Sequence, residues 1–216
     1  PYANKWAGAA LNSDAAFPLT YNAGADNTIT VSEGHYTFIF DDEGYADTRV
    51  AVLRTAAAPV SILSLSGLPE SERPSGAATP FTLTLSASPS PEERAFLRYT
   101  TDNWATSQAV PFTGFSGTPT GTASIPGQPV NTTVELYVLT TTVDPANWGF
   151  DTDLLTLAYE TNSGANYRYF HESTITPANN AADVPLRPTL EWFAIDGAAT
   201  YDLQLATSPD FTAPLV

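Results

Sequence analysis

Acidic residues gather in two stretches of the sequence that could hold a calcium ion. The first is FDDEGYAD at residues 40–47, and the second is DPANWGFDTD at residues 144–153. Calcium takes about six to eight oxygen ligands, and neither stretch has the ligand order of an EF-hand. A solvated acidic turn is therefore the favoured interpretation of both stretches. We keep Asp144, Asp151 and Asp153 as a candidate calcium site and expect no other cofactor.

The residue types that carry out covalent and acid-base catalysis form no recognisable pattern. The chain has no cysteine, and its two histidines, His35 and His171, are expected as partly exposed residues at strand ends. The sequence GFSG at residues 114–117 lacks the second glycine and the strand-to-helix context of a nucleophile elbow. Carboxylate pairs for glycoside hydrolysis are brought together only by the fold, but the acids here lie mostly in turns. We therefore expect a protein that is not an enzyme.

Aromatic residues offer a second kind of chemistry, because exposed Trp and Tyr rings can stack on the apolar faces of sugars. We expect Trp104 and Trp192 to close the ends of hydrophobic cores. Trp6 and Trp148 lie among Ala, Asn and Gly in less patterned sequence. They are the candidate carbohydrate-binding residues.

Four residues of the middle of the chain are predicted to share the outward face of neighbouring strands. They are Phe96, Arg98, Tyr137 and Leu139. An exposed apolar patch of several residues usually marks a contact surface. We expect this patch to bind a partner, and the alternative is that a neighbouring module covers it.

Composition and charge exclude several classes of protein. The chain has 216 residues, 43% of them hydrophobic, and a net charge of −15 that disfavours binding to nucleic acid. No apolar run is long enough to cross a bilayer, so we expect no membrane insertion. The absence of Cys and Met and the presence of a single lysine, Lys5, favour an extracellular or cell-surface location.

The elements that must position these residues are strands. In FTLTLSA, Phe81, Leu83 and Leu85 fall on one face, and Thr82 and Thr84 fall on the other. Similar alternation occurs at residues 35–40, 48–55 and 132–140, with Gly, Pro, Asn and Asp between the strands. This pattern predicts an all-β fold of β-sandwiches.

One short helix is expected, at residues 151–160. Asp151 would cap it, and Leu154, Leu155 and Ala158 would pack inward.

Two Pro-marked joints predict three segments. The joints are TAAAPVSI and STITPANNAADVPLRPTLEW. The segments are a β-rich segment at 1–57, a complete sandwich at 58–171, and the first part of another sandwich at 172–216.

A repeated motif supports tandem sandwiches. LRYTTDNWATS and LQLATSPDFTA share a strand, a turn with an Asp and a following aromatic residue. Asp102 is expected to bind turn amides and Trp104 to plug the core end. Asp210 and Phe211 are expected to do the same in the second copy.

These stretches resemble known modules. PLRPTLEWFAIDGAATYDLQLATSPDFT resembles the first half of a fibronectin type III-like module, with Trp192 in its core and Tyr201 and Leu203 on the facing strand. The middle segment, through FLRYTTDNWATS and IPGQPVNTTVELYVLTT, is similar to Ig-like modules of large secreted surface proteins, especially those of the Bacteroidota. Residues 1–57 resemble part of a carbohydrate-binding sandwich.

The resemblance implies tandem Ig-like and fibronectin type III-like sandwiches, of which the flanking ones are incomplete. We expect an extracellular structural or adhesive segment that is completed by further sequence or by an identical subunit, head to tail, as in a filament. The alternative is an accessory carbohydrate-binding segment of a secreted polysaccharide-degrading enzyme. Neighbouring modules, identical subunits or a polysaccharide are the expected partners.

Overall fold

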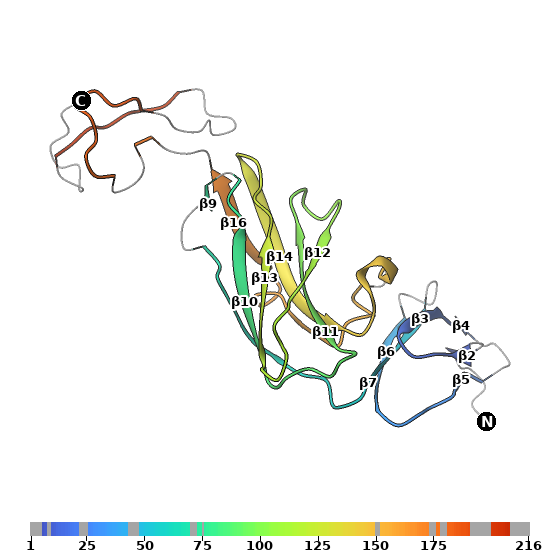
Figure 1. Ribbon diagram of the computed structural model, residues 1–216. Helices are drawn as coiled ribbons and strands as arrows, with labels where there is room; N and C mark the ends of the chain where they lie inside the picture. Colours follow the sequence, from blue (N-terminus) through green and yellow to red (C-terminus); the bar gives the residue numbers. More distant parts are fainter. Residues whose placement is uncertain are drawn as a thin grey trace. The chain divides into compact units, whose positions relative to one another are not determined.

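The computed structural model describes residues 6–7, 10–21, 26–42, 48–69, 73–74, 76–149, 152–172, 176–177, 181–190 and 200–207 (Figure 1). The chain divides into two compact units, Pro1–Glu172 and Ser173–Val216. All the named strands belong to the first unit. Among the described residues, regular secondary structure consists of strands and one 3₁₀ helix, η2 (Pro145–Asn147). The prediction of an all-β fold is therefore confirmed.

Two sheets make up residues 58–172. One has three antiparallel strands in the order β13-β10-β8, and the other has the order β12-β11-β14-β16-β9, with β15 also paired to β14. The strands of the first sheet are β8 (Ile62–Ser66), β10 (Thr79–Leu85) and β13 (Thr120–Ile125). The strands of the second are β9 (Arg73–Pro74), β11 (Arg94–Thr100), β12 (Gln108–Pro111), β14 (Thr132–Thr141), β15 (Ala158–Glu160) and β16 (Tyr167–Glu172).

One hydrophobic core joins these two sheets, an arrangement compatible with a β-sandwich. Phe81, Leu83 and Leu85 of β10 are buried in it, as the alternating sequence predicts. Leu97 of β11 and Leu136 of β14 lie in the same core. Side chains of a strand point alternately to its two faces, so the residues between these positions must face away from the core.

The first segment contains short strands around a second three-stranded sheet. This sheet has the antiparallel order β3-β7-β6, formed by β3 (Ala15–Pro18), β7 (Arg49–Thr55) and β6 (His35–Asp41). The others form two-stranded pairs: β1 (Trp6–Ala7) with β4 (Thr20–Tyr21), and β2 (Ala10–Leu11) with β5 (Thr28–Ile29).

Strand β7 is buried on both faces. Val50 and Val52 point to a small core with Leu11 and Leu19. Ala51 and Leu53 point the other way and belong to a core shared with residues of the 58–172 region. Within TRVAVLRT, the four residues VAVL form a continuous apolar run, which is typical of a strand covered on both sides.

The expected helix at 151–160 is wrong in its described part. Residues 152–155 form a turn, and Ala158 begins β15. Leu154 and Leu155 are buried as expected, because they pack into the shared core. Asp151 lies outside the described residues.

Two further expectations need correction. His171 is completely buried and not partly exposed, since its position in β16 points into the sandwich beside the ring of Tyr169, with centroids 5.4 Å apart. In the second unit, Tyr201 and Leu203 are exposed, whereas the fibronectin type III-like resemblance implies that they lie on the strand facing a core Trp192. Trp192, Asp210 and Phe211 lie outside the described residues.

Within the part of the chain that the structure describes, no helix has the length and apolar character needed to span a membrane.

Candidate binding surface on the six-stranded sheet

Three successive rows of side chains on the outer face of the large sheet bear on the predicted patch. Strand register places Phe96 opposite Leu139, and Arg98 opposite Tyr137. In the third row, Glu135 of β14 lies opposite Arg168 of β16. Because these positions alternate with the core residues, the face changes from apolar to aromatic to charged along the strands.

The apolar row is covered by other parts of the same unit. Phe96 is 3% exposed and Leu139 is fully buried. Both share a core with Ala51 and Leu53 of β7. Trp148, Leu154 and Leu155 complete this core from the chain that follows β14. This half of the predicted patch is thus an internal contact, while Arg98 and Tyr137 remain partly exposed.

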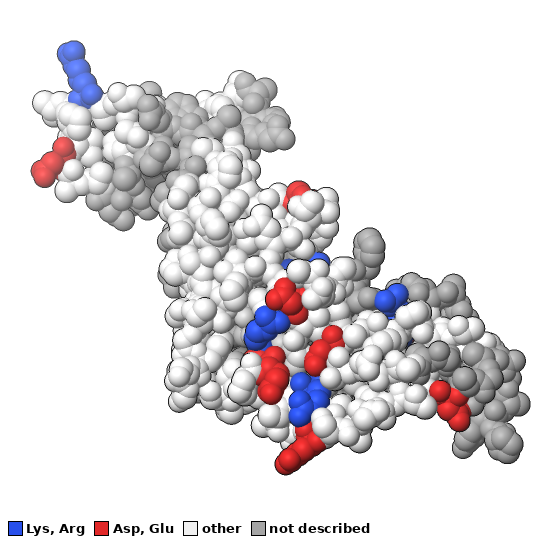
Figure 2. All heavy atoms as spheres, turned by 45° about the vertical axis from the view of Figure 1, so that its right-hand side comes forward, with Lys and Arg blue, Asp and Glu red and all other residues white. Residues whose placement is uncertain are grey.

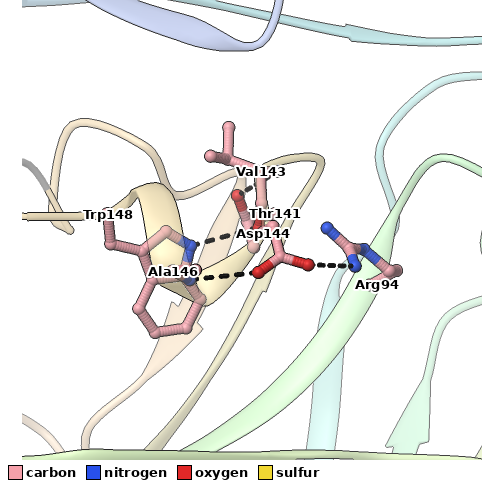
Figure 3. A network of polar contacts seen from close by, with 6 residues as sticks. All are labelled: Arg94, Thr141, Val143, Asp144, Ala146 and Trp148. Carbon is pink, nitrogen blue, oxygen red and sulfur yellow. Dashed lines mark hydrogen bonds and ion pairs between the residues drawn. The ribbon is translucent and has the colours of Figure 1, made fainter.

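Trp148 is one of the rings that cover this row, which corrects the expectation of an exposed Trp148. Its side chain is 5% exposed, and its ring meets Phe96 edge to face at a centroid distance of 5.4 Å. Its Nε1–H donates to the Val143 carbonyl at 3.1 Å (Figure 3). No ring face is left for a sugar here. Trp6 lies in β1, and its side chain is outside the described residues.

Asp144 is the N-cap residue of η2 in the same loop. Its carboxylate caps η2 by accepting from Ala146 N–H at 3.0 Å and also accepts from Arg94 at 3.3 Å (Figure 3). The Ala146 hydrogen bond, followed by Arg94, lowers the pKa of Asp144 below its usual value. Asp153 is exposed nearby in the sequence, and Asp151 lies outside the described residues. The described residues contain no group of three acidic, His or Cys side chains able to hold a metal.

The aromatic row is open and is organised by Arg98. Its Nη1 donates to the Tyr137 hydroxyl at 2.6 Å, and its Nε donates to Ser107 Oγ at 3.0 Å. The guanidinium lies 5.7 Å from the centroid of the Trp104 ring and 5.8 Å from that of Tyr137. The two rings are themselves 5.4 Å apart. The rings are tilted by 41° to each other, and the three groups hold one another in place, since cations and aromatic faces attract.

Trp104 is therefore not the plug of the core that its position after Asp102 suggests. It is half-buried on the outer face, and its Nε1–H donates to Glu135 at 2.9 Å. The second oxygen of Glu135 pairs with Arg168 at 3.1 Å. A positive φ of 67° at Trp104 turns the chain over this face.

The predicted turn role of Asp102 is confirmed. Its carboxylate accepts from the Thr106 N–H at 2.9 Å, from the Thr106 hydroxyl at 2.6 Å and from the Thr100 hydroxyl at 2.7 Å. These hydrogen bonds, led by that of the Thr106 side chain, lower the pKa of Asp102.

A pocket of about 400 Å³ opens beside Tyr137. It is lined by Tyr137, Asp153, Thr156, Tyr159 and Thr161. Burial raises the pKa of Tyr137, whereas its hydrogen bond from Arg98 acts in the opposite direction. Our sequence analysis missed Tyr159 and Thr161, although the alternation of AYE at 158–160 is a signal of a strand with an outward Tyr.

Two ion pairs lie on or beside the large sheet. Figure 2 shows acidic and basic side chains gathered over the same part of the surface. The ion pairs Arg168–Glu135 and Arg94–Asp144 both involve residues of the large sheet or its loops.

No family model, curated protein or solved structure matches this chain. The geometry of the chain itself must carry any functional argument.

Proposed function

We propose that this chain is a structural or adhesive segment of an extracellular surface protein and has no enzymatic role. The observation that carries the proposal is the core shared by β7 and the large sheet. Linked modules that share a core transmit load and orientation between them better than modules joined by a free linker, because interfaces between independent domains permit relative motion.

The strand order supports an Ig-like or fibronectin type III-like assignment for residues 58–172. If the short strands β9 and β15 are set aside, seven strands remain in the described part of residues 58–172. The first, second and fifth form one sheet, and the third, fourth, sixth and seventh form the other. Ig-like sandwiches distribute their strands between two sheets in a closely similar way. The fold alone does not define an activity, so the structural role rests on the shared core.

Neighbouring modules or identical subunits are the proposed partners. The net charge of −15 and the absence of cysteine suit an exposed protein that is not held together by disulfides. The test is to raise antibodies against the full chain and to label intact and permeabilised cells of the source organism. We expect labelling of intact cells and recovery of the antigen in a high-mass surface fraction. Labelling that requires permeabilisation would overturn the proposal.

A further inference from the structure

We propose that the pocket between Tyr137 and Tyr159 on the outer face of the large sheet binds a pyranose unit of a neutral polysaccharide. This inference goes beyond the structural role and does not depend on it. It places the site away from Trp6 and Trp148, on residues that form a pocket.

The floor of the pocket is a regular piece of sheet. Leu139 pairs with Tyr159 in the β14–β15 ladder, so Tyr159 shares the outer face with Leu139 and Tyr137. Thr161 follows two residues after Tyr159 and lines the same pocket. Tyr159 is 68% exposed although Leu139 beside it is buried. An exposed ring fixed on a strand is a suitable platform for the apolar face of a sugar.

The wall of the pocket is the turn that connects β14 to β15. Leu154 and Leu155 anchor this turn in the shared core. Thr141 also donates a hydrogen bond to the Leu155 carbonyl, and Thr156 donates one to the Thr152 carbonyl at 2.7 Å. The anchored turn presents Asp153 and Thr156 to the pocket. The site is thereby formed before any ligand arrives, which lowers the entropic cost of binding.

The polar groups select a ligand rich in hydroxyl groups. No hydrogen bond or ion pair among the described residues occupies the Asp153 carboxylate, which can accept from two neighbouring hydroxyls. Thr156, Thr161 and Tyr159 supply hydroxyls that both donate and accept. A volume of about 400 Å³ falls in the range of small-ligand sites, about 300–1,000 Å³.

The charges favour a neutral sugar over an acidic one. The described lining contains one carboxylate and no cation. Arg98, which donates to Tyr137 of the lining, also donates to Ser107. Since Asp153 and the net charge of −15 both repel anions, uronate-rich chains should bind poorly.

Affinity electrophoresis of the full chain tests the proposal. Native gels would contain galactomannan, xyloglucan, arabinoxylan or glycogen, with polygalacturonate as the anionic comparison. We expect at least one neutral polysaccharide to retard the chain. Tyr159→Ala and Asp153→Asn should each raise the dissociation constant about fivefold or more, the loss typical of a residue central to binding.

Matched controls separate this site from the rest of the surface. Phe38→Ala removes another exposed ring, and Asp42→Asn makes the same change of charge as Asp153→Asn. Both should be retarded like the parent chain. The proposal is overturned if no neutral polysaccharide retards the parent, if polygalacturonate retards it equally, or if Tyr159→Ala or Asp153→Asn binds as the parent does. The labelling of intact cells does not depend on polysaccharide binding. Failure of the sugar-binding proposal can therefore be distinguished from failure of the proposed structural role.

Discussion

Glu93 is an acidic residue that is buried in the structure. It is 2% exposed, and both carboxylate oxygens accept from the Val60 N–H, at 3.3 and 3.2 Å. Among the described residues, neither ion pair of this part of the chain includes Glu93. Burial raises the pKa of Glu93 above its usual value, and hydrogen bonding by the Thr140 side chain and the Val60 N–H opposes this shift. A buried carboxylate without a cation is costly when it is ionised.

This burial predicts a specific pH dependence for Glu93→Gln. Because the folded-state pKa exceeds the unfolded value of about 4.3, the folded state binds more protons between these two pKa values. The parent's free energy of unfolding should therefore fall as pH rises through this window. Glutamine keeps an acceptor for Val60 and removes the charge. As pH rises through this window, the free energy of unfolding of Glu93→Gln should increase relative to that of the parent. The total increase should be about 1.4 kcal/mol for each pH unit by which folding raises the pKa of Glu93.

Urea unfolding at pH values from 4 to 7 measures this difference. The control is Glu92→Gln, because Glu92 is the exposed neighbour in the sequence. Its stability relative to the parent should change little with pH. A difference between Glu93→Gln and the parent that is constant over this range would contradict the argument.

At the scale of elements, β7 is the strand that joins the first segment to the sandwich. Its two faces contribute to different cores, with Leu53 in the shared core and Val52 in the core with Leu11. Asp14 reinforces the contact, since its carboxylate accepts from Arg54 N–H of β7 at 3.2 Å and from the Thr142 hydroxyl after β14.

A double-mutant cycle tests this coupling. Leu53→Ala and Leu139→Ala should each cost about 2–5 kcal/mol, because both side chains are fully buried. Their combined effect should differ from the sum by about 0.5–3 kcal/mol, as for residues in one cluster. Val52→Ala combined with Leu139→Ala should be additive within about 0.5 kcal/mol. Additivity in the first pair, measured by urea unfolding, would show that β7 does not share a core with β14.

At the scale of the whole molecule, the chain divides into two compact units, and the first includes both the β-rich segment and the sandwich. We expect limited proteolysis of the full chain to leave a stable fragment that ends near residue 172. Residues 56–60 should resist cleavage, because β7 before them is buried in the shared core and Val60 is buried in the sandwich core. Mass spectrometry of the fragments over time checks this. A stable fragment beginning near residue 58 would mean that the first segment is not packed against the sandwich.

Alternation in the sequence was enough to predict the inner faces of the central strands of the sandwich. Phe81, Leu83 and Leu85 alternate with threonines, and a half-buried strand permits only that period. The turn at Asp102 was equally predictable, because its hydrogen bonds join residues that are close in sequence. Hydrogen bonds between residues close in sequence form independently of how the rest of the chain folds.

Tertiary structure alone decided which segment covers each outer face. Sequence analysis placed Trp104 in the core and Trp148 at the surface, and the structure reverses both. Alternation shows that Phe96 and Leu139 point outward, but it holds no information on the distant residue, Leu53, that buries them. The pocket at Tyr159 arises in the same way, because its wall is fixed by burial of Leu154 and Leu155 in that shared core. Burial of an outward face depends on contacts between residues remote in sequence, and these form only when the whole unit folds.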